Sequence, residues 1–178
     1  MSSPPPPPML PTDADPRLGP ILSGLTACLC ASLTDGGRPA CACCLVWGDS
    51  PPAQDFCSCD CDGGHGQAWV RVVRQEPVPS QRRQARCLAW RMQTVIEVGV
   101  ARCVAVVAAD GQSAPTCEQR ETDAWGMVLD TRLLRQAVAC CDILNDHAAG
   151  IQVLPGPVTP IGPRGGCAGV TMQITVEA

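Results

Sequence analysis

The sequence predicts an α+β fold in which two helices cover one face of a mostly antiparallel β-sheet. Two segments, residues 18–33 and 115–145, place apolar residues at steps of three and four, which is the spacing of one helical face. The region between them is rich in β-branched residues, and residues 169–178 alternate apolar and polar, as a half-buried strand does. The expected order is helix, cysteine-rich loop, two or three strands, long helix and final strand.

An extended arm is expected before the folded domain. The first sixteen residues contain seven prolines, five of them consecutive at Pro4–Pro8, and this composition favours a stiff polyproline II conformation. A solvent-exposed tail and an arm that lies on a neighbouring subunit fit this composition equally well. We therefore divide the 178 residues into an arm (1–16) and a single α+β domain (17–178), into which a cysteine-rich loop (41–65) is inserted.

The element boundaries follow from capping residues, glycines and prolines. The first helix should begin near Asp15-Pro16 or Gly19-Pro20 and end at Gly36-Gly37. Residues 66–78 predict a strand, and 86–107 predict two strands or one long bent strand with a possible bulge at Gly99. The polar stretch 81–84 should separate these strands, and residues 109–112 should form a turn. Pro115 suits the opening of the second helix, and four prolines (155, 157, 160 and 163) predict a loop before the final strand.

Charge and composition argue against several classes of protein. The net charge is −4, there is no lysine, and no arginine stripe is interleaved with aromatic residues, so direct binding to nucleic acid is not expected. The apolar stretches are shorter than the roughly 20 residues of a membrane helix. The first residues lack the basic and apolar regions of a signal peptide. In a reducing cytoplasm the cysteines would be made as thiols, so any disulfide would have to form later or outside the cell.

No catalytic constellation is predicted, and we expect the protein not to be an enzyme. The two histidines, His65 and His147, lie in a glycine-rich turn and just beyond the second helix, without an oxyanion-hole loop beside either one. Asp60 and Asp62 are a closely spaced acidic pair in a turn beside thiols, and we interpret them as part of a solvated turn. Residues 63–66 (GGHG) precede a strand and no lysine is present, which argues against a phosphate-binding loop.

Six of the fourteen cysteines fall between residues 41 and 61. Cys41-x-x-Cys44 has the spacing of half a zinc site, and the other half would come from later residues of the same loop. The candidate structural zinc ligands are Cys41, Cys44, Cys57, Cys59, Cys61 and His65. Disulfides formed after assembly and free thiols in a packed loop remain open alternatives. A closed four-ligand zinc site would only stabilise the loop, because it leaves no open position for a substrate. We therefore expect the protein to require no cofactor, although a structural zinc ion would fit.

The remaining cysteines are expected to be small buried apolar residues. Cys28 and Cys30 lie in the first helix. The others are scattered over strands, second helix and final loop: Cys87, Cys103, Cys117, Cys140, Cys141 and Cys167. Cys103 with Cys140 or Cys141 is a pair that could meet across the sheet.

From about residue 17 to 177 the chain resembles small virion proteins encoded among the head–tail connector and tail genes of long-tailed bacteriophages that infect high-GC actinobacteria. The segments that carry this resemblance are ILSGLTACLCASL, CACCL followed by CSCDC, GQAWVRV, VIEVGVARC, LLRQAVACCDIL and GVTMQITVEA. Within this group the order helix, sheet, long helix, strand is similar to that of tail terminators.

The resemblance implies a structural role. A tail terminator forms a ring, typically a hexamer, that caps the finished tail tube and joins it to the connector in the neck. It would be assembled in the host cytoplasm and reside in the virion, with tube and connector proteins as partners and no membrane, and DNA would only pass through its lumen. The cysteine cluster departs from this family's pattern, and neck stoppers and adaptors are similar in size. A zinc-stapled protein-binding adaptor is the alternative from another class, and a redox enzyme is disfavoured because Cys41-x-x-Cys44 lacks a strand-to-helix context.

Overall fold

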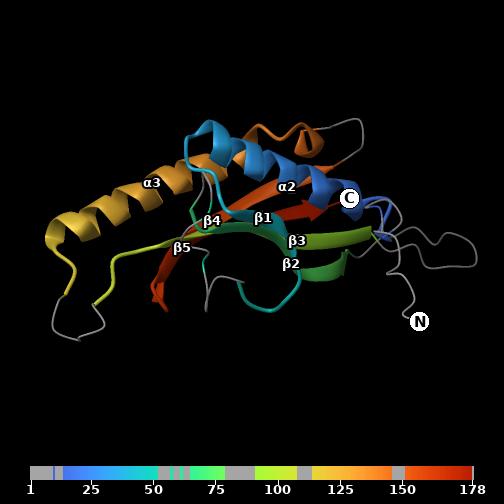
Figure 1. The fold of residues 1–178 in the computed structure, drawn as a ribbon. Helices are drawn as coiled ribbons and strands as arrows, with labels where there is room; N and C mark the ends of the chain where they lie inside the picture. The colour runs from blue at the N-terminus through green and yellow to red at the C-terminus, as the bar shows by residue number, and fades with distance from the viewer. Residues whose placement is uncertain are drawn as a thin grey trace, which may run out of the picture.

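The computed structural model describes residues 10, 14–51, 57, 61, 65–78, 91–107, 114–145 and 151–177. These residues form two layers, a twisted sheet and a pair of helices that lie across one of its faces (Figure 1). The elements are, in chain order, α2 (Leu18–Asp35), β1 (Ala42–Val46), β2 (Gln67–Val78), β3 (Arg91–Cys103), α3 (Cys117–Ala139), the 3₁₀ turn η2 (Asp142–Leu144), β4 (Gln152–Arg164) and β5 (Cys167–Glu177).

The sheet has five strands in the order β1-β2-β3-β5-β4. Strand β1 is parallel to β2, and every other neighbouring pair is antiparallel. The predicted α+β class, with a mostly antiparallel sheet and two helices, is therefore confirmed. Strands β1 and β4 form the two edges of the sheet.

Both helices begin at side chains that accept backbone hydrogen bonds. The carboxylate of Asp15 accepts from the N–H groups of Arg17 (2.8 Å) and Leu18 (2.7 Å), as the predicted start near Asp15 requires, and α2 ends at Gly36. Helix α3 starts at Cys117, two residues later than Pro115 suggests, because Thr116 is its cap and exchanges hydrogen bonds with Gln119. It ends at Ala139, and the rest of the predicted helix is the turn η2.

The core lies between the helices and one face of the sheet. Alternate residues of the strands, such as Val70, Ile96 and Ile174, point into it and are fully buried. Helix α2 has the length and apolar composition that a membrane-spanning helix would also have, a criterion that core helices meet as well. Here its apolar face packs into the core through Leu25 and Leu29, which are both 0% exposed. A smaller buried cluster on the opposite face of the sheet consists of Cys57, Trp69, Ala101 and Cys167.

The two edge strands correct the sequence prediction. The expected loop 41–65 begins with a strand, β1, and the expected proline-rich loop before the final strand is β4. Proline is compatible with β4 because an edge strand has one side without ladder hydrogen bonds, so a missing N–H there breaks none. The pairing of β4 with β5 shifts register between Pro155 and Val158 and again between Ile161 and Arg164, which is how the proline-rich strand stays paired.

Strand β3 is one continuous strand, and its glycine is not a bulge. The register of β3 with both neighbours runs unbroken through Gly99, whereas the irregularity lies on β2 between Val72 and Arg74. Glycine is required at position 99 because the Trp69 ring occupies the place of a side chain, and a Cβ at this position would overlap with that ring. The arm residues 1–9 and 11–13, Asp60, Asp62, the stretch 81–84 and the turn 109–112 lie outside the described residues.

Candidate functional site

Three of the six predicted zinc ligands are joined in disulfides. Cys41 pairs with Cys61, and Cys57 pairs with Cys167 at the start of β5. Zinc binds a cysteine through its thiolate, so a sulfur held in a disulfide is not available as a ligand. Of the three states that the sequence left open for this segment, the structure contains disulfides at Cys41, Cys57 and Cys61 and a free thiol at Cys44.

The other predicted ligands are not gathered into a metal site in the part of the chain that the structure describes. Cys44 is an exposed thiol on β1. The backbone N–H of His65 donates to the carbonyl of Pro39 (3.0 Å), and its own carbonyl accepts from Arg102. Cys59, like His147, lies outside the described residues. Among the residues described, no group of three His, Cys, Asp or Glu side chains could hold a metal ion.

Disulfides also connect helix α2 to distant parts of the fold. Cys28 pairs with Cys141, 113 positions away, and Cys30 pairs with Cys43 on β1. The prediction that these two helix residues are isolated thiols is therefore wrong, and so is the proposed pairing of Cys103 with residue 140 or 141. Helices α2 and α3 pack side by side, which brings Cys141 to α2 instead of to the sheet.

Two more cysteines correct the expectation of buried thiols. Cys117 and Cys140 are free and exposed. Cys103 is itself disulfide-bonded, and its sulfur lies 3.2 Å from that of Cys57. Cys87 lies outside the described residues.

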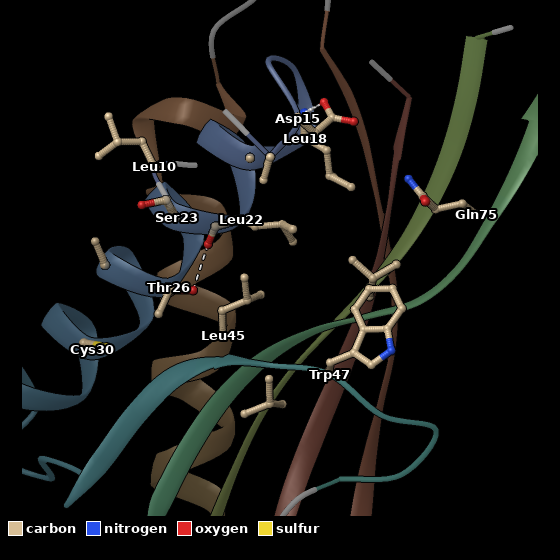
Figure 2. Close-up of a pocket in the computed structure, with 15 residues that line it drawn as sticks. Leu10, Asp15, Leu18, Leu22, Ser23, Thr26, Cys30, Leu45, Trp47 and Gln75 are labelled. Carbon is tan, nitrogen blue, oxygen red and sulfur yellow. Dashed lines mark hydrogen bonds between the residues drawn. The ribbon is translucent and has the colours of Figure 1, made fainter. Parts of the chain in front are cut away.

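An apolar groove of about 810 Å³ opens between the N-terminal half of α2 and strands β1 and β2. Figure 2 shows Leu18 and Leu22 of α2 on one side of it and Leu45 and Trp47 on the other. Trp47 is 89% exposed and Leu45 is 52% exposed, although both lie beside the apolar face of α2. The other lining residues are Leu10, Ala14, Asp15, Gly19, Ser23, Thr26, Ala27, Cys30, Val46, Val72 and Gln75.

A buried ion pair positions the turn that follows Trp47. Arg71 and Glu97 lie on the sheet face away from the helices, with 2.7 Å between the Arg71 Nε and a Glu97 oxygen, and both side chains are almost fully buried. The same carboxylate accepts from the indole N–H of Trp69 (3.1 Å). The other end of the Arg71 guanidinium donates to the carbonyl of Gly48 (3.0 Å). The backbone beside Trp47 is thereby attached to the core of the sheet.

A second buried charge cluster attaches α3 to the sheet. The carboxylate of Asp130 is 0% exposed and accepts hydrogen bonds from two arginines, Arg38 after α2 and Arg102 on β3. Arg102 also donates to the backbone carbonyls of Arg38 (2.7 Å) and Pro39 (3.0 Å). The hydrogen bond to Asp130 raises the pKa of the Arg38 guanidinium, so this arginine stays charged. The cluster holds three elements in fixed positions and presents no open site to a substrate.

Large apolar side chains are also exposed on α3 and β4. Trp125 (65% exposed) and Val128 (57%) continue the apolar stripe predicted for the second helix, but the N-terminal half of α3 extends past the sheet and leaves them in solvent (Figure 1). We call these two residues the α3 surface. Leu154 on the edge strand β4 is 64% exposed. The α3 surface is therefore a candidate contact surface, and β4 is another because it is an open edge of the sheet.

The groove is the feature that sequence reasoning missed. The segment CACCLVWGDS contains its signal, because a short apolar run that ends in tryptophan and glycine predicts an edge strand with an aromatic residue at its end. The cysteine spacing of this segment predicted a metal site instead of an edge strand beside a groove. The exposure of Trp47 depends on how β1 lies against α2, which local patterns do not determine.

Comparison with known proteins adds no assignment. No family model matches the chain, and no curated protein matches it. The proposal below therefore depends on the resemblance in sequence character, the order of the elements and the exposed apolar residues.

Proposed function

We propose that this chain is a structural subunit of a tailed-phage virion, a tail terminator that forms a ring, caps the tail tube and joins it to the head–tail connector. Two things support the proposal. One is the resemblance in sequence character from residue 17 to 177. The other is the order of the elements, in which a helix, three strands, a long helix and further strands make a two-layer α+β subunit.

The observation that carries the proposal is the exposure of apolar surface on two different elements. A ring of identical subunits needs heterologous contacts, in which one surface of a copy meets a different surface of the next copy. The α3 surface projects beyond the sheet, and β4 offers Leu154 together with the unpaired side of an edge strand. We propose that these two surfaces meet between neighbouring subunits, since burial of a tryptophan at an interface is a strong source of association.

Native mass spectrometry of the full chain tests the ring. A closed oligomer, expected to be a hexamer, should appear at micromolar concentration, and Trp125→Ala should shift the population towards monomer. Trp47→Ala is the matched control, because Trp47 is also an exposed tryptophan but lies in the groove and outside the proposed contact. A chain that stays monomeric even when mixed with tail tubes would refute the ring. A monomer that carries the mass of bound zinc would favour the protein-binding adaptor.

A further inference from the structure

The groove between α2 and the strands is built for an uncharged ligand. Among the described residues that line it, Asp15 has the one ionisable carboxylate, and this carboxylate already accepts the N–H groups of Arg17 and Leu18. The remaining lining side chains are apolar or polar and uncharged. A ligand with charged side chains would lose its hydration there without gaining a partner.

Trp47 gives the groove an aromatic side at its open end. Its indole is 89% exposed, and in the described part of the chain its N–H makes no hydrogen bond. The position of the residue is fixed, because the next residue, Gly48, is held by the buried Arg71. Proline-rich segments in polyproline II conformation dock in grooves with aromatic walls, and the fixed, exposed indole of Trp47 supplies an aromatic surface here.

The chain contains such a segment, and it starts at the groove. Leu10 lines the groove, so residues 1–9 continue from this point. From Met1 to Leu10 no side chain is charged, and the run Pro4–Pro8 would span about 16 Å at 3.1 Å per residue. A run of this length is long enough to lie along a groove of about 810 Å³ that Leu10 and Trp47 both line.

We propose that the proline-rich arm, residues 1–9, folds back onto its own chain and occupies this groove, with proline rings against the Trp47 indole. The backbone carbonyls of a polyproline II segment have no internal partners, so one of them can accept the indole N–H. Attachment through Leu10 places the arm at an effective concentration on the order of millimolar, which favours the same chain over a neighbouring copy. The arm would thereby shield the leucines of α2 and β1 from solvent. The proposal stands whether or not the chain forms a ring.

The indole N–H signals of a ¹⁵N-tryptophan-labelled protein test this assignment. Deleting residues 2–9 should shift the Trp47 signal towards that of a solvent-exposed indole and leave the Trp125 signal, far from the groove, unchanged. Replacing Pro4–Pro8 by five serines keeps the length of the arm and should give the same shift. If the Trp47 signal is identical in all three proteins, the arm does not reach the groove. If only the deletion shifts it, recognition of proline is refuted.

Two further samples identify the occupant. A synthetic peptide of sequence MSSPPPPPML should restore the Trp47 signal of the deleted protein at high peptide concentration, and it should not bind the deleted protein that also carries Trp47→Ala. In the second sample, labelled protein without residues 2–9 is mixed with unlabelled full-length protein that carries Trp47→Ala. The only arm that can reach the labelled groove then comes from another chain. No restoration is expected in this mixture at equal concentrations. Restoration there would show that a second copy supplies the arm and would overturn the same-chain assignment.

Discussion

Replacing Asp130 by asparagine should strongly destabilise the protein. The substitution preserves size and shape but removes the charge that compensates Arg38 and Arg102, whose nitrogens lie 2.7 and 3.2 Å from its oxygens. The Arg102 side chain is 5% exposed, so it would remain as an uncompensated buried charge. Breaking a buried pair in this way costs about 3–5 kcal/mol of unfolding free energy. With a urea m-value of about 2 kcal/mol per molar, the midpoint should fall by about 2 M.

Urea unfolding followed by circular dichroism, with the disulfides intact, measures this change. Asp123→Asn is the matched control on the same helix, since Asp123 accepts one hydrogen bond, from the N–H of Ala105 (2.9 Å), at an exposed position. The control should lose about 1 kcal/mol or less. If Asp130→Asn costs no more than Asp123→Asn, the charge cluster does not hold α3 on the sheet.

The pH dependence of stability provides a second readout for the same cluster. The hydrogen bond from Arg38 to Asp130 raises the pKa of the guanidinium in the folded state. A raised pKa contributes stability that is fully present below the unfolded-state pKa and is lost only as the pH rises through the folded value. This arginine should therefore cause no change in the urea midpoint between about pH 6 and pH 9. A steep loss over that range would contradict the assignment.

Three other predictions follow from the packing and the cross-links. Replacing Cys28 and Cys141 together by alanine should lower the unfolding free energy by up to about 4.7 kcal/mol, the loop-closure value for about 100 residues, measured by urea unfolding. Reduction of all disulfides should destabilise the protein further, as a thermal melt with and without reductant would report. Gly99→Ala should cost about 1–3 kcal/mol because the Trp69 ring fills the position of the new methyl group, whereas Gly162→Ala, with open space around it, should have little effect; equal losses would contradict this reasoning.

The helices and central strands could be predicted because their local signals agree with their tertiary environment. Leu25 and Leu29 follow helical spacing and are buried, and the alternation around Ile174 places that residue in the core. The edge strands β1 and β4 could not be recognised in the same way. Cysteine spacing and repeated proline are local signals for loops, and only pairing with a neighbouring strand makes these segments extended.

The candidate site was predicted less well than the fold. Spacing brought Cys41 and Cys61 into one group correctly, but spacing alone does not distinguish zinc from a disulfide. The partners of Cys28 and Cys57 lie more than 100 positions away, so only the tertiary fold brings them together. The groove could not be predicted because α2 and β1 together form the environment of Trp47. Local sequence patterns do not determine how far apart these two elements lie.

The sequence separation of the paired cysteines determines the order in which the disulfides can form during synthesis. Cys30–Cys43 and Cys41–Cys61 span 13 and 20 positions, so each can close soon after its second cysteine leaves the ribosome. Cys57 must wait until residue 167 has been synthesised. During that delay an oxidant would let Cys57 react with thiols made earlier and trap the nascent chain in a mispaired form. A reducing environment during synthesis, followed by oxidation of the completed chain, therefore gives the native pairing its best yield.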